Sequence, residues 1–131
     1  INVISYIWVS LVERVSCRSW SKIVKNLPYR AKTTAGDVID IRFNLHDETV
    51  DPVQVGNLIT VILESIDREI SLMGEVSNGD VLQAISMALG IRAHIIHAPV
   101  ETTSKLTKNL VNEALMALSE ATTIHAQSGR A

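Results

Sequence analysis

Apolar and polar side chains alternate between residues 38 and 46, where polar residues separate Ile39, Ile41, Phe43 and Leu45. An alternation with a period of two residues is typical of a β-strand that buries one of its faces. A single strand leaves its backbone N–H and C=O groups without partners. We therefore expect this strand to pair with the front of the chain or with a second copy. The remaining alternative is that residues 38–46 do not form a strand.

The apolar spacing becomes helical after residue 50, and the first predicted helix has signals at both of its ends. Asp51 is a favourable N-cap, and Pro52 suits the first helical position. Gly74 is a natural stop after about Met73. The apolar residues of this helix cover more than one face, a pattern found in central helices and at oligomer interfaces.

Two further helices are predicted, one from about Gly79 to Ala98 and one from a cap at residues 102–104 to about Gln127. Their short connections favour antiparallel neighbours. We therefore expect a mainly α fold, a small three- to four-helix bundle with one short β-strand or strand pair at residues 38–46. A second copy of the chain would complete the pairing if the front segment does not.

The first fifteen residues also follow a helical spacing. Residues 1–12 carry no charged side chain, but a membrane-spanning helix needs about 20 apolar residues. We interpret the segment as an amphipathic helix, and the alternative is the end of a truncated membrane segment with a basic flank. The apolar positions of the predicted helix are Ile4, Ile7, Trp8, Leu11, Val12 and Val15.

Charge divides the chain into two parts. Residues 1–32 hold six Lys and Arg residues and one acidic residue, whereas residues 33–131 hold six basic and thirteen acidic residues. The net charge of −2 therefore conceals a basic front and an acidic body. We divide the chain into a basic, aromatic-containing N-terminal helix or arm at 1–32, an acidic and mostly helical domain at 37–127, and a tail at 128–131.

The basic arm carries candidate interaction residues. Its cationic side chains recur at helical spacing and form one stripe, with aromatic residues close by. Such a stripe suits nucleic acid, an anionic lipid surface or an acidic protein surface. We favour self-association, because the acidic body of a second copy offers opposite charge and also gives the strand and the first helix a partner. The candidate residues are Trp8, Arg14, Arg18, Trp20, Lys22, Lys25 and Tyr29.

Residues 85–97 resemble a helix-turn-helix unit in their spacing, with Gly90 at the turn. In such a unit the second helix enters the major groove of DNA, and Arg92, His94 and His97 would make the polar contacts. The next proline would fall inside that helix, and the acidic body repels phosphate. The simpler interpretation is one continuous helix, which tolerates the glycine at a cost of about 1 kcal/mol.

Two other clusters of residues could hold a metal ion or act as acids and bases. His94 and His97 lie three residues apart, so on a helix both imidazoles would face one metal ion, but no acidic ligand stands at a matching position. Five carboxylates and His46 gather between residues 37 and 51, where strand, turn and helix-cap roles account for them. No nucleophile elbow, phosphate-binding loop or dinucleotide-binding motif is present. We therefore lean toward a non-catalytic protein without a cofactor or a metal site.

Cys17 is the sole cysteine, and the chain contains no N-glycosylation sequon. Both features favour a reducing compartment, and we expect a cytoplasmic protein. The function that fits best is a non-catalytic protein–protein interaction module that forms a homo-oligomer through the front segment and the first body helix. The alternative is a small DNA-binding regulator that uses the basic arm and the segment 85–97.

Overall fold

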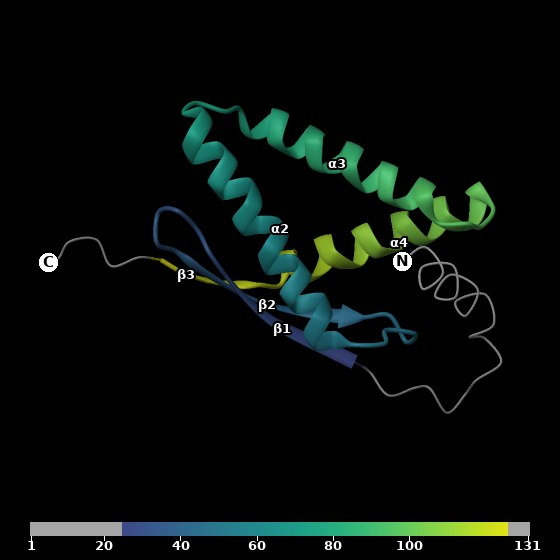
Figure 1. Cartoon of the computed structure of the whole chain (residues 1–131). Helices are drawn as coiled ribbons and strands as arrows, with labels where there is room; N and C mark the ends of the chain where they lie inside the picture. Colours follow the sequence, from purple (N-terminus) through teal and green to yellow (C-terminus); the bar gives the residue numbers. More distant parts are fainter. Residues whose placement is uncertain (1–24, 126–131) are drawn as a thin grey trace, which may run out of the picture.

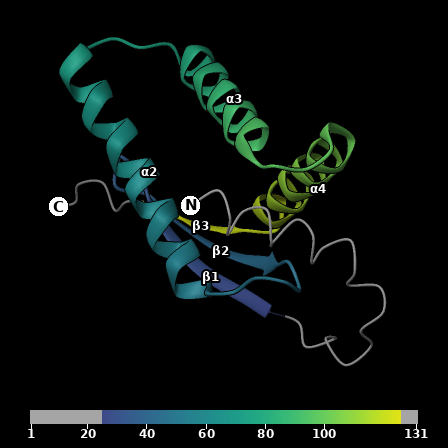
Figure 2. The same ribbon diagram turned by 45° about the vertical axis from the view of Figure 1, so that its right-hand side comes forward.

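The computed structural model describes residues 25–125, which form a three-stranded antiparallel sheet and three helices (Figure 1). The elements are β1 (Lys25–Lys32), β2 (Val38–Leu45), α2 (Pro52–Met73), α3 (Asn78–Ile95), α4 (Val100–Ser119) and β3 (Thr122–Ile124). The strand order is β1-β2-β3, so β2 is central. One end of α2 and one end of α4 lie close to the sheet, whereas α3 joins their outer ends, farthest from the sheet (Figure 2).

Strands β1 and β2 form a hairpin whose two faces differ in polarity. Leu27 lies opposite Phe43, and Tyr29 lies opposite Ile41 on the same face. The hairpin turns at Gly36, whose φ of 95° lies in the left-handed region that favours glycine. The strand expected at residues 38–46 is therefore present as β2, and its partner β1 comes from the end of the front segment.

Helix α2 begins and ends at the residues that the sequence indicates. The Asp51 side chain accepts a hydrogen bond of 3.2 Å from the backbone N–H of Gln54, and the helix starts with Pro52. At the other end, Gly74 has a φ of 88° and donates its N–H to the carbonyl of Ile70 at 3.1 Å. These contacts satisfy backbone groups that a helix end leaves without partners.

Helix α3 is shorter than the sequence indicates. Its N-cap is Ser77, whose hydroxyl oxygen accepts the N–H of Gly79 at 3.1 Å. The helix ends at Ile95 rather than at Ala98. The chain leaves the helical conformation before Pro99, because the residue that precedes a proline avoids that conformation.

The predicted fold class, a small helix bundle with one strand or strand pair, is wrong. The described residues form a mixed α/β fold with a three-stranded sheet. The third helix, α4, follows Pro99 without a side-chain cap and ends at Ser119, not at Gln127. Residues 122–124 then form β3 against Val38–Asp40. Thr and Ile favour extended backbone, and this pairing satisfies groups on β2 that a helix would leave open.

The hydrophobic core of the described residues is small. Its buried apolar side chains are Ile41, Leu106 and Ala117, so the core lies where α4 crosses β2. Helix α3 packs mainly against α4, and neither α2 nor α3 contains a fully buried residue. Within residues 25–125, we find no helix with both the length and the apolar character needed to cross a membrane.

Candidate functional site

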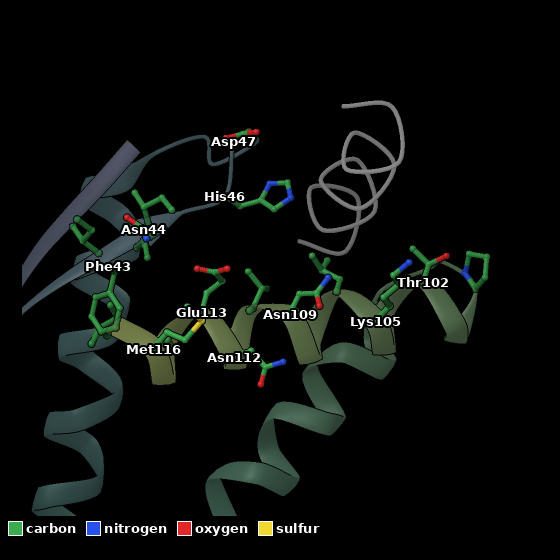
Figure 3. Close-up of a pocket in the computed structure, with 18 residues that line it drawn as sticks. Phe43, Asn44, His46, Asp47, Thr102, Lys105, Asn109, Asn112, Glu113 and Met116 are labelled. Atoms are coloured by element: carbon green, nitrogen blue, oxygen red, sulfur yellow. The ribbon is translucent and has the colours of Figure 1, made fainter. Parts of the chain in front are cut away.

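A groove of about 1400 Å³ lies between the sheet and the helices α2 and α4 (Figure 3). Its floor is apolar because alternate residues of β1 and β2 share the face of the sheet that the helices approach. Helix α4 adds Leu106, Leu110 and Ala114, which lie one turn apart on a single stripe. The remaining apolar lining residues are Leu27, Phe43, Leu45, Val55, Ile59, Pro99 and Met116.

Polar side chains surround the opening of the groove. His46 and Asp47 lie on the loop that follows β2, and Asn109 and Glu113 lie opposite them on α4 (Figure 3). Lys105 lies one turn before Asn109 on the same helix. The rim therefore carries both signs of charge around an apolar floor. Its other polar lining residues are Asn44, Thr102 and Asn112.

The loop after β2 is held in a defined turn. The ring Nδ1 of His46 accepts the backbone N–H of Glu48 at 3.0 Å. The carbonyl oxygen of His46 accepts both the N–H of Thr49 at 2.9 Å and its hydroxyl at 2.6 Å. Thr49 is buried. These bonds fix the edge of the groove that His46 and Asp47 form.

Three of the five carboxylates between residues 37 and 51 make separate structural contacts. The guanidinium of Arg30 donates to Asp40 across the hairpin, from Nε to Oδ1 at 2.6 Å and from Nη2 to Oδ2 at 3.1 Å. These hydrogen bonds lower the pKa of Asp40 and raise the pKa of Arg30. Oδ2 of Asp37 lies 3.7 Å from Nδ1 of His125, and the side chain of Asp51 caps α2. Asp37, Asp40 and Asp51 thus serve the sheet and a helix end, whereas Asp47 lies on the rim of the groove.

Residues 85–97 do not form two helices, since α3 passes through Gly90 without a turn. Arg92, His94 and His97 are exposed. His94 lines a hollow of about 330 Å³ between the end of α3 and the start of α4, whereas His97 does not. No group of three or more His, Cys, Asp and Glu side chains among the described residues is placed to hold a metal ion.

The candidate residues of the basic arm fall into two groups. Lys25 is the first residue of β1, and its backbone lies opposite Leu45. The Tyr29 hydroxyl lies 2.8 Å from the Thr60 hydroxyl, so the half-buried Tyr29 side chain connects β1 to α2. The other candidates lie outside the described residues; they are Trp8, Arg14, Arg18, Trp20 and Lys22.

Sequence patterns identify the walls of the groove but not the groove itself. Alternation in β2 places Phe43 and Leu45 on one face, and helical spacing in α4 places Leu106 and Leu110 on one stripe. Neither pattern shows that the two faces meet, because the crossing of α4 over β2 depends on tertiary packing. Comparisons of the chain with protein-family models, with curated proteins and with solved structures found no match.

Proposed function

We propose that this chain is a non-catalytic protein–protein interaction module that acts as a homo-oligomer, with α2 and α3 in the contact between copies. The observation that carries this proposal is the apolar surface on these two helices. Val61 and Ile62 on α2 are 58% and 52% exposed, and Leu82 on α3 is 67% exposed. A helix that carries many large apolar side chains and buries none of them fully is normally covered by a partner.

The free energy available from burial of these exposed side chains is comparable to the cost of association. Full burial of a large aliphatic side chain contributes about 1.5–3 kcal/mol, so a half-exposed one retains about 1 kcal/mol. Six such residues in each of two copies would contribute about 12 kcal/mol, a value within the range of about 4–15 kcal/mol that association costs. The dimer population should therefore depend on concentration. The six residues are Leu58, Val61, Ile62, Leu72, Leu82 and Leu89.

Charge and composition support the same proposal. Residues 1–32 are basic and residues 33–131 are acidic, so each copy offers charges of both signs to a second copy. A cytoplasmic location belongs to this proposal, because the sole cysteine, Cys17, favours a reducing compartment.

The oligomer is tested by light scattering on the full chain over a range of protein concentrations. The wild type should form dimers or larger oligomers, and the double variant Val61→Glu/Leu82→Glu should be monomeric because it places a charge on each apolar helix face. Gln54→Glu/Gln83→Glu is the matched control. It adds the same charges to exposed polar positions of the same helices and should leave the oligomer unchanged. A wild type that is monomeric at every concentration would refute the proposal.

A further inference from the structure

We infer that the groove between the sheet, α2 and α4 is the docking site of residues 4–15 of the same chain, which bind along α4 as an amphipathic helix. The groove lies next to the place where the preceding chain joins the sheet. The front segment carries a pattern of apolar and charged residues that matches the groove and its rim.

The front segment joins the described structure next to the groove. Lys25, the first residue of β1, follows residues 1–24 directly and lies opposite Leu45 at the end of the hairpin. Leu45, His46 and Asp47 all line the groove. The chain that precedes Lys25 therefore starts at the rim of the groove and not on the far side of the sheet.

The lengths of the two parts are compatible. A helix over residues 4–15 would be about 18 Å long, and α4 with its 20 residues is about 30 Å long. The nine residues from 16 to 24 span up to about 30 Å when extended, a distance equal to the length of α4.

The chemistry of the groove suits a helix more than a small molecule. Small-molecule pockets usually have volumes of about 300–1000 Å³, whereas this groove has about 1400 Å³ and an apolar lining from the four elements β1, β2, α2 and α4. Helices that bind grooves present apolar anchors three, four and seven residues apart. The front segment has this spacing, in the residues Ile4, Ile7, Trp8, Leu11 and Val15.

Charges at the rim match the segment that connects the helix to β1. Arg18 and Lys22 follow the apolar anchors. Asp47 lies beside the point of entry, and Glu113 faces it from α4 (Figure 3). Lys105, the basic residue of the rim, lies two turns before Glu113 on α4. The acidic groups therefore lie where the basic part of the segment would pass.

This inference does not depend on the proposed oligomer. The apolar residues that represent the oligomer contact, Val61 and Leu82, do not line the groove. Light scattering reports on that contact, whereas the two experiments below report on the groove. Either proposal can fail while the other stands.

Tryptophan fluorescence of the full chain tests the docking. In Trp20→Phe, Trp8 is the only tryptophan, and docking predicts blue-shifted emission with several-fold weaker acrylamide quenching than in urea. In that background Leu110→Glu should shift the emission to the red and restore the quenching. The matched control is Leu115→Glu, a change on the same helix at a residue outside the groove, and it should leave Trp8 unchanged. An exposed Trp8 in the parent, or equal effects of both changes, would overturn the inference.

Disulfide formation provides a second test that does not require a destabilising charge. A disulfide needs Cα atoms within about 7 Å. In the Cys17→Ser background, Leu110→Cys should form an intramolecular disulfide on mild oxidation with at least one of Ile4→Cys, Ile7→Cys and Leu11→Cys. Leu115→Cys should form none with the same three partners. A disulfide between two chains would assign the groove to a second copy and overturn the inference, as would the absence of any disulfide.

Discussion

Replacement of Leu106 by alanine is expected to lower the free energy of unfolding by about 2–3 kcal/mol. Leu106 is 8% exposed and lies at the crossing of α4 and β2. Leu→Ala substitutions at buried sites cost about 2–5 kcal/mol, depending on the cavity they leave. Because Leu106 lies in a small core at the edge of the groove, neighbouring side chains can relax into the vacated space, which places the cost in the lower part of this range. The loss is a large fraction of the about 5–15 kcal/mol that stabilises a typical domain.

Urea unfolding followed by far-UV circular dichroism measures this loss, with all variants at one protein concentration because association would add to the stability. The matched control is Leu115→Ala, the same change on the same helix at a residue that is 64% exposed. Its effect should stay within about 0.5 kcal/mol. Equal losses in the two variants, or a loss below about 1 kcal/mol for Leu106→Ala, would refute a core centred on α4 and β2.

Two further substitutions test contacts at the edges of the fold. Asp51→Ala removes the N-cap of α2 and should lower the free energy of unfolding by about 1 kcal/mol in the same urea titration. Asp51→Asn still accepts the hydrogen bond and should retain most of the stability. Equal losses in the two variants would argue against capping. Asp40→Asn should slightly lower the Tm near neutral pH, and the difference should vanish in acid. The hydrogen bond from Arg30 lowers the pKa of Asp40 in the folded chain. Its stabilisation is therefore present above the pKa of the unfolded state and is lost as the pH falls through the folded-state value. A Tm difference that persists in acid would contradict this account.

Local signals predicted several elements, and long-range pairing determined the others. Alternation identifies residues 38–45 as a strand, and Asp51 and Gly74 mark the ends of α2. Strand β1 is harder to predict because Pro28 is typical of a helix end. In the structure Pro28 lies in an edge strand, where a residue without an N–H is tolerated. Strand β3 has only the β-branched run Thr122–Ile124 as a signal, and its partner lies far away in the sequence.

The candidate sites were less predictable than the fold. The spacing at Gly90 fits a turn between two helices, but the surrounding helix continues because a single glycine costs too little to break it. The groove lacks a sequence motif altogether. Its floor comes from Phe43 and its wall from Leu110, and only the path of the chain through three helices brings these residues together.

Strand β2 is paired with a strand that directly precedes it and with one that follows all three helices (Figure 1). During synthesis, the β1–β2 hairpin can therefore form long before β3 leaves the ribosome. Until then the backbone of Val38–Asp40 is an open sheet edge, and such edges recruit strands from other molecules. Once synthesised, the three residues of β3 close this edge, a role that their small share of the buried surface would not indicate.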